Sequence, residues 1–256
     1  MNFAIRKLLP EAIRVPLWGN RRRWGLVVDE NDSCWKEWQE TYADFYVQNQ
    51  REGIGTKVND AGYRVMADID LSGKRVLEIG AGDIRHLRWI KGLPSEYLLA
   101  DISTEMMAFA QQRLEERGIP LCKLLLRRDQ RLPLADNSID VIVSFYSLEH
   151  LYPLRPYLED MYRVLSPGGI LIGAIPAEGG LAWGGGRMLT SRRWFKRNTT
   201  IDPDKIICWE HPNFADHVVS ELDQLFQRKS LSHWPLAWAP ILDLNLIIRF
   251  HYRKPG

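Results

Sequence analysis

The feature that most constrains the fold is a regular alternation of short apolar runs and helical patterns between about residues 72 and 176. Five buried strands are predicted at the apolar runs KRVLEIG, EYLLADI, LCKLLLR, IDVIVSF and GGILIGAIP. Helical patterns separate them at IRHLRWIKG, TEMMAFAQQRLEERG and RPYLEDMYRVL. Strands this apolar are typical of a parallel sheet with helices on both faces. Because crossovers are right-handed, we expect an α/β, doubly wound architecture.

Two regions interrupt this alternation and define the expected organisation of the chain. We divide it into an aromatic-rich N-terminal arm, residues 1–70, and a main domain, residues 71–256, with an insertion at 177–215. In the arm, WKEWQETYADFYVQNQ predicts a helix and GIGTKVNDAG predicts a loop. The insertion is too long and glycine-rich for an ordinary connection, and we assign it to acceptor recognition. After the insertion, a helix is predicted at FADHVVSELDQLFQRK. The last strands are predicted at SLSHWPLAWA and LNLIIRFHYRK.

Composition excludes several classes of protein. The chain has 256 residues and a formal net charge of +2, which is too balanced for a surface that binds nucleic acid throughout. Its three cysteines include no CxxC pair, which excludes a disulfide framework or a zinc ribbon and fits a reducing compartment. No run reaches the roughly 18 apolar residues of a membrane span. Pro10 and Pro16 interrupt the N-terminal apolar pattern, so we expect a packed arm, or at most peripheral membrane contact, in a cytoplasmic protein.

A glycine turn, Gly80-Ala81-Gly82, follows the first predicted strand and indicates a ligand site at the carboxyl edge of the sheet. A dinucleotide is the obvious candidate, but Arg85 occupies the place of the third glycine in G-x-G-x-x-G. Carboxylates at Glu78 and Asp83 would repel a pyrophosphate that the helix N-terminus otherwise attracts. The turn therefore favours a ligand with positive charge and no phosphate.

S-adenosylmethionine has this chemistry, since it combines an ammonium, a sulfonium and an adenosine. Asp101 ends the second strand, where a carboxylate can accept the ribose hydroxyls, and Ile102 can pack on the adenine. Asp129 follows the third strand, where it can accept the exocyclic amine of adenine. Acidic residues thus follow three successive strands in register.

These stretches resemble the class I S-adenosylmethionine-dependent methyltransferases, in particular the small-molecule group. The resemblance covers residues 74–176 through VLEIGAGDIRHL, LLADIS, RRDQRLPLADNSIDVIVSFYSLEHL and YRVLSPGGILIGAIP. It implies a seven-stranded sheet with an antiparallel last strand and an N-terminal segment that covers the cofactor as a lid. Ile84 stands where many members have a third glycine. The cofactor-binding residues that it implies are Glu78, Gly80, Ala81, Gly82, Asp101, Ile102, Asp129, Gln130 and Ser144, the last beside the sulfonium.

Methyl transfer from a sulfonium is an in-line displacement, so the protein mainly aligns the acceptor and excludes water. A hydroxyl acceptor also needs a general base, which histidine supplies near neutral pH. Two Glu-His pairs, Glu149-His150 and Glu210-His211, provide candidates. We expect His150 or His211 to be the base, with the neighbouring carboxylate, such as Glu149, orienting the ring.

Glu149, His150 and His211 are also the kinds of ligand that hold a divalent ion in some small-RNA and quinone-pathway methyltransferases. In those enzymes an additional glutamate lies one turn earlier, where this chain has Tyr146. We therefore expect no metal.

Five basic residues crowd the insertion and bear on the identity of the acceptor: Arg187, Arg192, Arg193, Lys196 and Arg197. They indicate either a solvated surface or a clamp for an anionic acceptor, such as a sugar, a lipid-linked glycan or RNA. The balanced charge argues against DNA and RNA.

We expect methyl transfer to a small-molecule or glycan- or lipid-linked acceptor, at oxygen, with S-adenosylhomocysteine as the product. The alternatives are an RNA methyltransferase, a non-catalytic S-adenosylmethionine-binding scaffold protein and, last, an NAD-dependent oxidoreductase.

Overall fold

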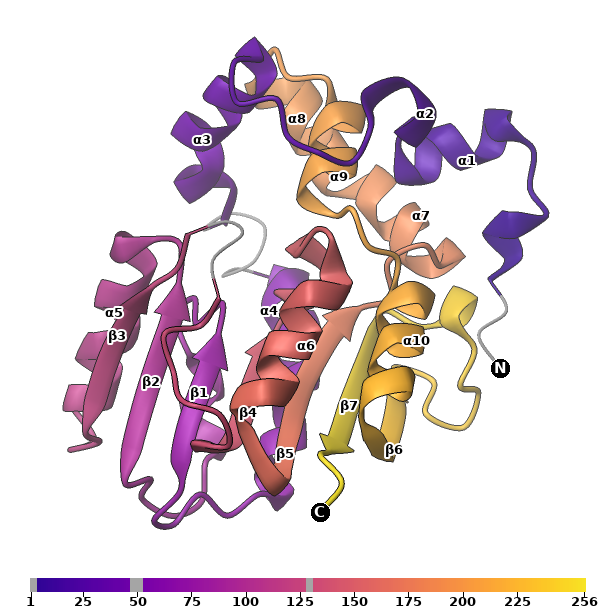
Figure 1. Cartoon of the computed structure of the whole chain (residues 1–256). Coiled ribbons are helices and arrows are strands. Elements are labelled where there is room, and N and C mark those ends of the chain that lie inside the picture. The colour runs from indigo at the N-terminus through magenta and orange to yellow at the C-terminus, as the bar shows by residue number, and fades with distance from the viewer. Residues whose placement is uncertain (1–3, 47–52, 128–130) are drawn as a thin grey trace.

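The computed structural model describes residues 4–46, 53–127 and 131–256, and its centre is one seven-stranded sheet (Figure 1). The strands lie in the order β3-β2-β1-β4-β5-β7-β6, and β7 is antiparallel to both of its neighbours. The sheet is made of β1 (Arg75–Ile79), β2 (Glu96–Asp101), β3 (Leu121–Leu125), β4 (Ile139–Phe145), β5 (Leu165–Pro176), β6 (Gln227–Trp234) and β7 (Ile247–Arg253). The expected architecture, including the antiparallel last strand, is confirmed. Strands β1 to β5 are parallel, so their carboxyl ends lie at the same edge of the sheet. Doubly wound folds bind ligands at this edge.

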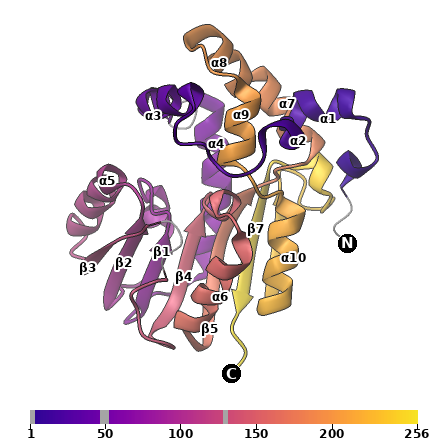
Figure 2. The ribbon, with the colours of Figure 1, turned by 45° about the horizontal axis from the view of Figure 1, so that its top comes forward.

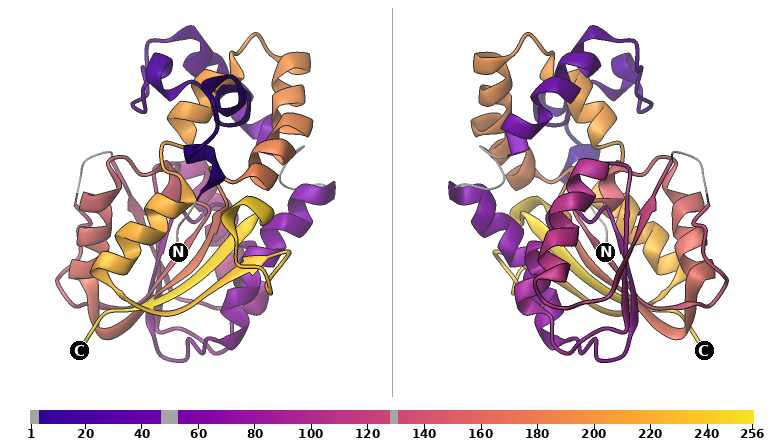
Figure 3. Two further views of the ribbon diagram at one scale, coloured as in Figure 1. Left: turned by 90° about the vertical axis from the view of Figure 1, so that its right-hand side faces the viewer. Right: turned by 90° about the vertical axis from the view of Figure 1, so that its left-hand side faces the viewer.

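Helices cover both faces of the sheet, and the alternation of strand side chains explains how (Figure 3). Leu77 of β1 lies in a core cluster with residues of α6 (Leu154–Val164) and α10 (Ala215–Leu225). Val76, which points to the opposite face, lies in a second cluster with residues of α5 (Thr104–Glu115). Burial on both faces accounts for the continuous apolar character of these strands.

A layer of helices that we call the cap lies above the carboxyl edge of the sheet (Figures 1 and 2). Three of its helices come from the N-terminal region: α1 (Glu11–Trp18), α2 (Arg21–Trp24) and α3 (Ser33–Tyr46). Three come from the insertion: α7 (Leu181–Leu189), α8 (Ser191–Asn198) and α9 (Pro203–Glu210). The insertion is thus helical, and Trp35, Trp38, Phe195 and Trp209 give the cap a hydrophobic core of its own.

The N-terminal region is divided between the cap and the sheet. The predicted loop GIGTKVNDAG is wrong, because residues Gly53–Tyr63 form helix α4, which packs on the α5 face of the sheet. Tertiary packing overrides its weak helix propensity. A Cβ at Gly62 would lie 2.1 Å from the Tyr146 hydroxyl oxygen, so glycine here allows the helix to approach the ring. Short 3-10 turns at Ile5–Lys7, Arg64–Asp68, Arg85–Trp89, Leu148–His150 and Leu242–Leu244 complete the described secondary structure.

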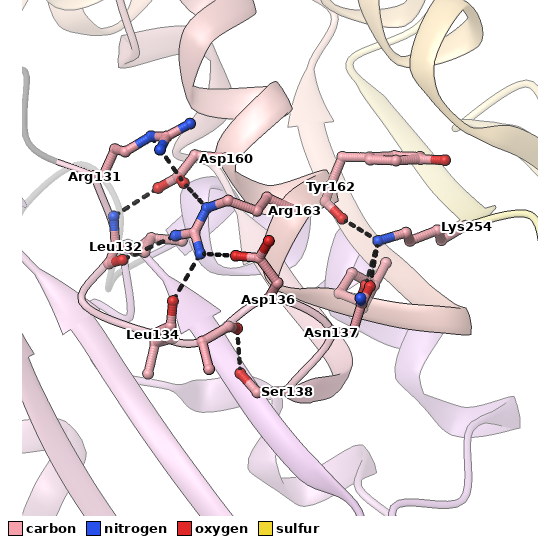
Figure 4. A network of polar contacts seen from close by, with 12 residues as sticks. Arg131, Leu132, Leu134, Asp136, Asn137, Ser138, Asp160, Tyr162, Arg163 and Lys254 are labelled. Carbon is pink, nitrogen blue, oxygen red and sulfur yellow. Dashed lines mark hydrogen bonds and ion pairs between the residues drawn. The ribbon is translucent and has the colours of Figure 1, made fainter.

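A polar network holds the segment before β4 against α6 (Figure 4). The Arg163 guanidinium donates to the carbonyls of Leu132 and Leu134 at 3.0 and 2.7 Å, and to Asp136 at 2.7 Å. Asp160 accepts from the Leu132 backbone N–H at 2.6 Å. These bonds fix Leu132, which contacts the cavity described below. Among the described residues, no helix combines the length and the apolar character that crossing a bilayer requires.

The cap core predicts a local effect of mutation. Trp209 is 6% exposed in this core, so Trp209→Ala should destabilise the cap by about 3–5 kcal/mol. Hydrogen exchange should accelerate in α8 and α9 more than in β1 and β4. Trp238, which is 82% exposed, is the matched control, and Trp238→Ala should change stability by less than about 0.5 kcal/mol. Equal effects of the two substitutions would contradict a separate cap core.

Candidate active site

A cavity of about 1350 Å³ lies between the carboxyl edge of the sheet and the cap. Its lower walls come from the turn after β1, the end of β2 and the segment after β4. Its upper walls come from α3, α7 and α9. A ligand-binding pocket for one drug-sized molecule is typically about 300–1,000 Å³, so this cavity has room for a cofactor and an acceptor side by side.

The glycine turn forms one end of the cavity. Gly80 and Gly82 have φ angles of 68° and 54°, in the left-handed region that favours glycine. A Cβ at Gly80 would lie 2.5 Å from the Ser147 Cβ, so the first glycine allows this segment to pack. Ile84, where the resembled family often has glycine, also adopts a left-handed backbone with φ 41°. Its side chain is buried, and this packing offsets a strain of about 1–2 kcal/mol.

Two carboxylates at this turn are fixed by buried partners. Glu78 accepts a hydrogen bond from the Tyr97 hydroxyl at 2.6 Å, and its Oε2 lies 3.4 Å from Nε2 of His86. Burial and the Glu78 charge raise the pKa of Tyr97 well above its usual value, so the phenol stays a donor. Asp83 lies 3.8 Å from the Arg113 guanidinium. Both carboxylates contact the cavity at the glycine turn.

Asp101 lies at the end of β2, where the resemblance places the ribose contact. Its Oδ1 accepts from the Ser103 backbone N–H at 2.9 Å, and Oδ2 lies 3.5 Å from the Gly82 N. Burial raises the pKa of this carboxyl, against the effect of these N–H groups. Ile102 and Met106 line the cavity beside it. A carboxylate flanked by apolar side chains fits a ribose and an adjoining adenine.

Three other residues are predicted to bind the cofactor: Asp129, Gln130 and Ser144. Asp129 and Gln130 lie outside the described residues. Ser144 is not among the cavity residues, because its hydroxyl packs beneath the wall at 2.6 Å from the Ser147 hydroxyl. Ser147 donates to the Ile79 carbonyl at 2.9 Å and itself contacts the cavity. The end of β4 and the turn after it therefore contact the cavity through Phe145, Tyr146 and Ser147, not through Ser144.

The two predicted histidines meet at the other end of the cavity, where the sheet faces the cap. The rings of His150 and His211 have centroids 4.7 Å apart. His150 Nδ1 lies 3.2 Å from Glu210 Oε2, and Trp38 donates to the other oxygen of Glu210 at 2.7 Å. The adjacent Glu149 is more distant, at 3.9 Å from Nε2 of His150. The carboxylate that orients His150 thus comes from the cap and not from its neighbour in the sequence.

His211 has a carboxylate partner that the sequence reasoning missed. Its Nδ1 lies 3.2 Å from Oε2 of Glu178, which follows β5. The Arg187 guanidinium donates to both Glu178 oxygens at 2.9 and 2.5 Å, and Trp183 donates to Oε2 at 2.9 Å. Although burial opposes it, the charge of Arg187 and the contact with His211 hold the pKa of Glu178 well below its usual range. Glu178 could have been predicted from the sequence, because it follows a predicted strand and ligands bind at the carboxyl ends of such strands.

The surroundings of the two histidines give their rings different charges at neutral pH. Burial disfavours the charged His150 ring, but Glu210 and Glu149 outweigh it and raise its pKa to about 9. Burial lowers the pKa of His211 to about 4, with help from the positive charges of Arg187 and His150. Burial also raises the pKa of Glu149 to about 7, and its Oε2 has no hydrogen-bond partner among the described residues. At neutral pH a cationic imidazole therefore faces a neutral one.

The basic residues of the insertion are either paired with carboxylates or exposed outside the cavity. Arg187 is neutralised by Glu178, and Arg192 pairs with Asp204 at 2.5 Å. The other three members are exposed and are not among the cavity residues: Arg193, Lys196 and Arg197. Within the described part of the chain, no group of three or more His, Cys, Asp or Glu side chains has the arrangement of a metal site.

Comparison with known proteins shows which proteins the chain resembles. Residues 77–173 match the family model described as a methyltransferase domain. The chain is 36% identical over 104 residues to the ubiquinone/menaquinone biosynthesis C-methyltransferase of Azotobacter vinelandii, covering 39% of this chain and 41% of that protein. It is 35% identical over 111 residues to a probable phthiotriol/phenolphthiotriol dimycocerosates methyltransferase of Mycobacterium ulcerans, covering 42% and 41%.

The chain thus spans about two-fifths of the length of the curated relatives that it matches. Among solved structures, it resembles the N-methyltransferase NodS of Bradyrhizobium japonicum in complex with S-adenosyl-L-homocysteine, with a TM-score of 0.57. The sequence identity is 16%, and the alignment covers 88% of this chain and all of that one. At this identity the likeness shows the fold alone.

The position of Asp101 predicts its contribution to cofactor binding. Asp101→Asn should weaken binding of S-adenosylhomocysteine about tenfold to hundredfold, because hydrogen bonds to a charged group contribute about 1.5–3 kcal/mol. Isothermal titration calorimetry measures this change. Glu159→Gln, which removes an exposed carboxylate on α6, is the control and should leave the affinity unchanged. An unaltered affinity in Asp101→Asn would exclude the ribose role.

The charge difference between the histidines predicts two separate titrations by NMR. His150 should titrate near pH 9, and His211 should stay neutral down to about pH 4. Since the pKa of His150 is raised, its ion pair with Glu210 stabilises the fold at neutral pH and is lost as the pH rises through 9. Glu210→Gln should lower the pKa of His150, whereas Glu159→Gln should not. A wild-type His150 that titrates below pH 7 would contradict the assignment.

Proposed function

We propose that the chain is a class I S-adenosylmethionine-dependent methyltransferase, which the match of residues 77–173 to a methyltransferase-domain model supports, and that it methylates a hydroxyl oxygen of a small-molecule acceptor. The observation that carries the proposal is the pairing of a neutral His211 with a cationic His150 inside the cavity that also contacts Asp101. A pKa of about 4 makes the free His211 ring a weak base, but its neutral imidazole is available to accept the proton that the hydroxyl loses during transfer, and the neighbouring cation favours the deprotonated acceptor.

The aromatic lining of the cavity supports an acceptor with an apolar or aromatic body. Aromatic side chains of the cap and of the sheet domain line this cavity: Trp35, Trp38, Tyr42, Phe45, Tyr63, Tyr157, Trp183, Phe195 and Trp209. Rings of this kind contribute large apolar contact areas and hold a flat molecule by stacking. The charges of Glu178 and Arg187 compensate each other, which favours an uncharged acceptor over an anionic one.

The proposed mechanism assigns one role to each residue of the cluster. Bound S-adenosylmethionine supplies an activated methyl group on a positively charged sulfur. His211 takes the hydroxyl proton at Nε2, while Glu178, near Nδ1, fixes the ring and stabilises the imidazolium that forms. His150, held cationic by Glu210, lowers the pKa of the acceptor hydroxyl. The cap excludes water, so the acceptor is the available nucleophile.

Carbon is a second candidate for the methylated atom. The Azotobacter vinelandii relative is named a C-methyltransferase, which favours this alternative. The same base serves both reactions, because removing the proton of an aromatic hydroxyl raises the electron density on ring carbons as well as on oxygen. A ¹³C NMR spectrum of product made with a ¹³C-methyl donor distinguishes the two, since O-methyl and C-methyl carbons have separate chemical shifts.

A transfer assay with radiolabelled methyl donor tests the proposal against separated pools of hydroxylated small molecules, lipids, glycans and RNA. We expect label in small molecules that carry an aromatic or activated hydroxyl. His211→Ala should then reduce turnover about 10²–10⁴-fold, the usual contribution of a general base, while S-adenosylhomocysteine binding persists. His217→Ala, which removes an exposed histidine on α10, should keep full turnover. Label confined to RNA, or full turnover in His211→Ala, would contradict the proposal.

A further inference from the structure

The loop that joins β6 to β7 presents apolar side chains to solvent. Trp238 is 82% exposed, and Ile241 and Leu244 are each about half exposed. Asp243 is the one charged residue of this loop, and it is buried. Exposed apolar side chains that are scattered singly need no explanation, but a group of them on one segment marks an interaction surface. None of the three exposed side chains lines the active-site cavity, so the mechanism above does not use them.

The N-terminal segment extends this apolar surface. The Asp243 carboxylate accepts from the Ile5 backbone N–H at 3.0 Å, which fixes the loop to the 3-10 turn Ile5–Lys7. This turn, α1 and the loop lie on the same side of the molecule, at the right of Figure 1 and toward the viewer in the left view of Figure 3. Leu8, directly after the turn, is 73% exposed, and Ile13 of α1 is nearly half exposed. Both segments thus expose apolar side chains on one side of the protein.

Cationic side chains border this surface. Between residues 4 and 24 the chain carries six basic side chains and one acidic side chain, Glu11. The Lys7 and Arg22 side chains are 59% and 83% exposed. Lys7 lies 3.2 Å from Asp216, and Arg22 lies 4.0 Å from Glu11, so both cations have a carboxylate nearby and still face solvent. The border of the apolar surface is therefore accessible and positively charged.

A bilayer that contains anionic lipids matches both parts of this surface. Tryptophan is enriched where a membrane meets water, because its ring is apolar and its N–H can stay hydrated. Lys and Arg beside apolar side chains are attracted to anionic headgroups. A second copy of this chain matches less well, because a two-fold interface would bring two sets of the cations Lys7 and Arg22 together.

We propose that this side of the protein, which we call the membrane face, docks on an anionic phospholipid bilayer. Its members are Leu8, Ile13, Trp238, Ile241 and Leu244, with Lys7 and Arg22 at the border. The apolar side chains enter the interface between headgroups and acyl chains, and the two cations contact the headgroup phosphates. Docking is peripheral, since the apolar side chains come from a loop, a turn and one short helix.

The membrane face is joined to the active-site cavity through a single buried residue. Asp243 also accepts from the Leu181 backbone N–H at 3.1 Å, at the start of α7. Trp183 and Arg187 of the same helix line the cavity. Docking therefore holds this wall of the cavity close to the bilayer surface. The inference stands on exposure and charge, and it does not depend on the identity of the methyl acceptor.

Cosedimentation of the full chain with vesicles tests the proposal. We expect binding to phosphatidylcholine vesicles that contain phosphatidylglycerol, and weaker binding to pure phosphatidylcholine. Trp238→Ala should weaken the binding about tenfold, because this ring no longer enters the interface. The variant should keep its fold, since the ring is exposed. Leu125→Ala is the matched control and should bind like the wild type, because Leu125 is exposed on β3, at the opposite edge of the sheet.

A second pair of variants tests the role of charge. Arg22→Gln should weaken binding to the anionic vesicles about fivefold, the usual contribution of one cation close to such a surface. Lys123→Gln removes the same formal charge from an exposed position on β3 and should leave the binding unchanged. Equal weakening by these two variants would show that only the net charge matters and would overturn the assignment of the face.

Fluorescence quenching locates the contact. Phospholipids with brominated acyl chains quench tryptophans that enter the bilayer, so they should quench the wild type and have much less effect on Trp238→Ala. Absence of vesicle binding would overturn the proposal, and so would equal weakening by Trp238→Ala and Leu125→Ala. A dimer in solution that Trp238→Ala dissociates would also contradict it, because a second copy would then cover the membrane face.

Discussion

The contact between His150 and Glu210 is the interaction on which the site depends. It joins the segment after β4 to the end of α9, and so connects the sheet to the cap across the cavity. The pair also sets the chemistry, because Glu210 keeps His150 cationic while that charge helps to keep His211 neutral. One ion pair therefore joins the sheet to the cap and gives two adjacent imidazoles different charges.

The two ends of the cavity follow different physical rules. At the cofactor end, backbone geometry dominates: the left-handed turn and the N–H groups that hold Asp101 come from the ends of parallel strands. At the acceptor end, side-chain charges dominate: Glu178 and Glu210 are each held by a cation and by a tryptophan N–H. The first end is built from the common fold, and the second requires the cap.

The strands of the sheet could be predicted well from the sequence. The inner strands are buried on both faces and therefore appear as continuous runs of apolar residues, which is a local signal. The prediction failed at α4, since the glycines of this helix weaken the local helix signal and its packing partner Tyr146 lies far along the chain. The Glu-His motifs identified the histidines, but neither histidine has its sequence neighbour as its nearest carboxylate: His150 pairs with Glu210 and His211 with Glu178. No local pattern predicts these pairings, because they depend on how the cap lies over the sheet.

The most direct test is a crystal structure of the protein with S-adenosylhomocysteine. The ribose should lie on Asp101, and the sulfur should face the side of the cavity where His150 and His211 meet, with space between for the acceptor. A ligand bound outside this cavity, or a sulfur directed away from the two imidazoles, would contradict the account.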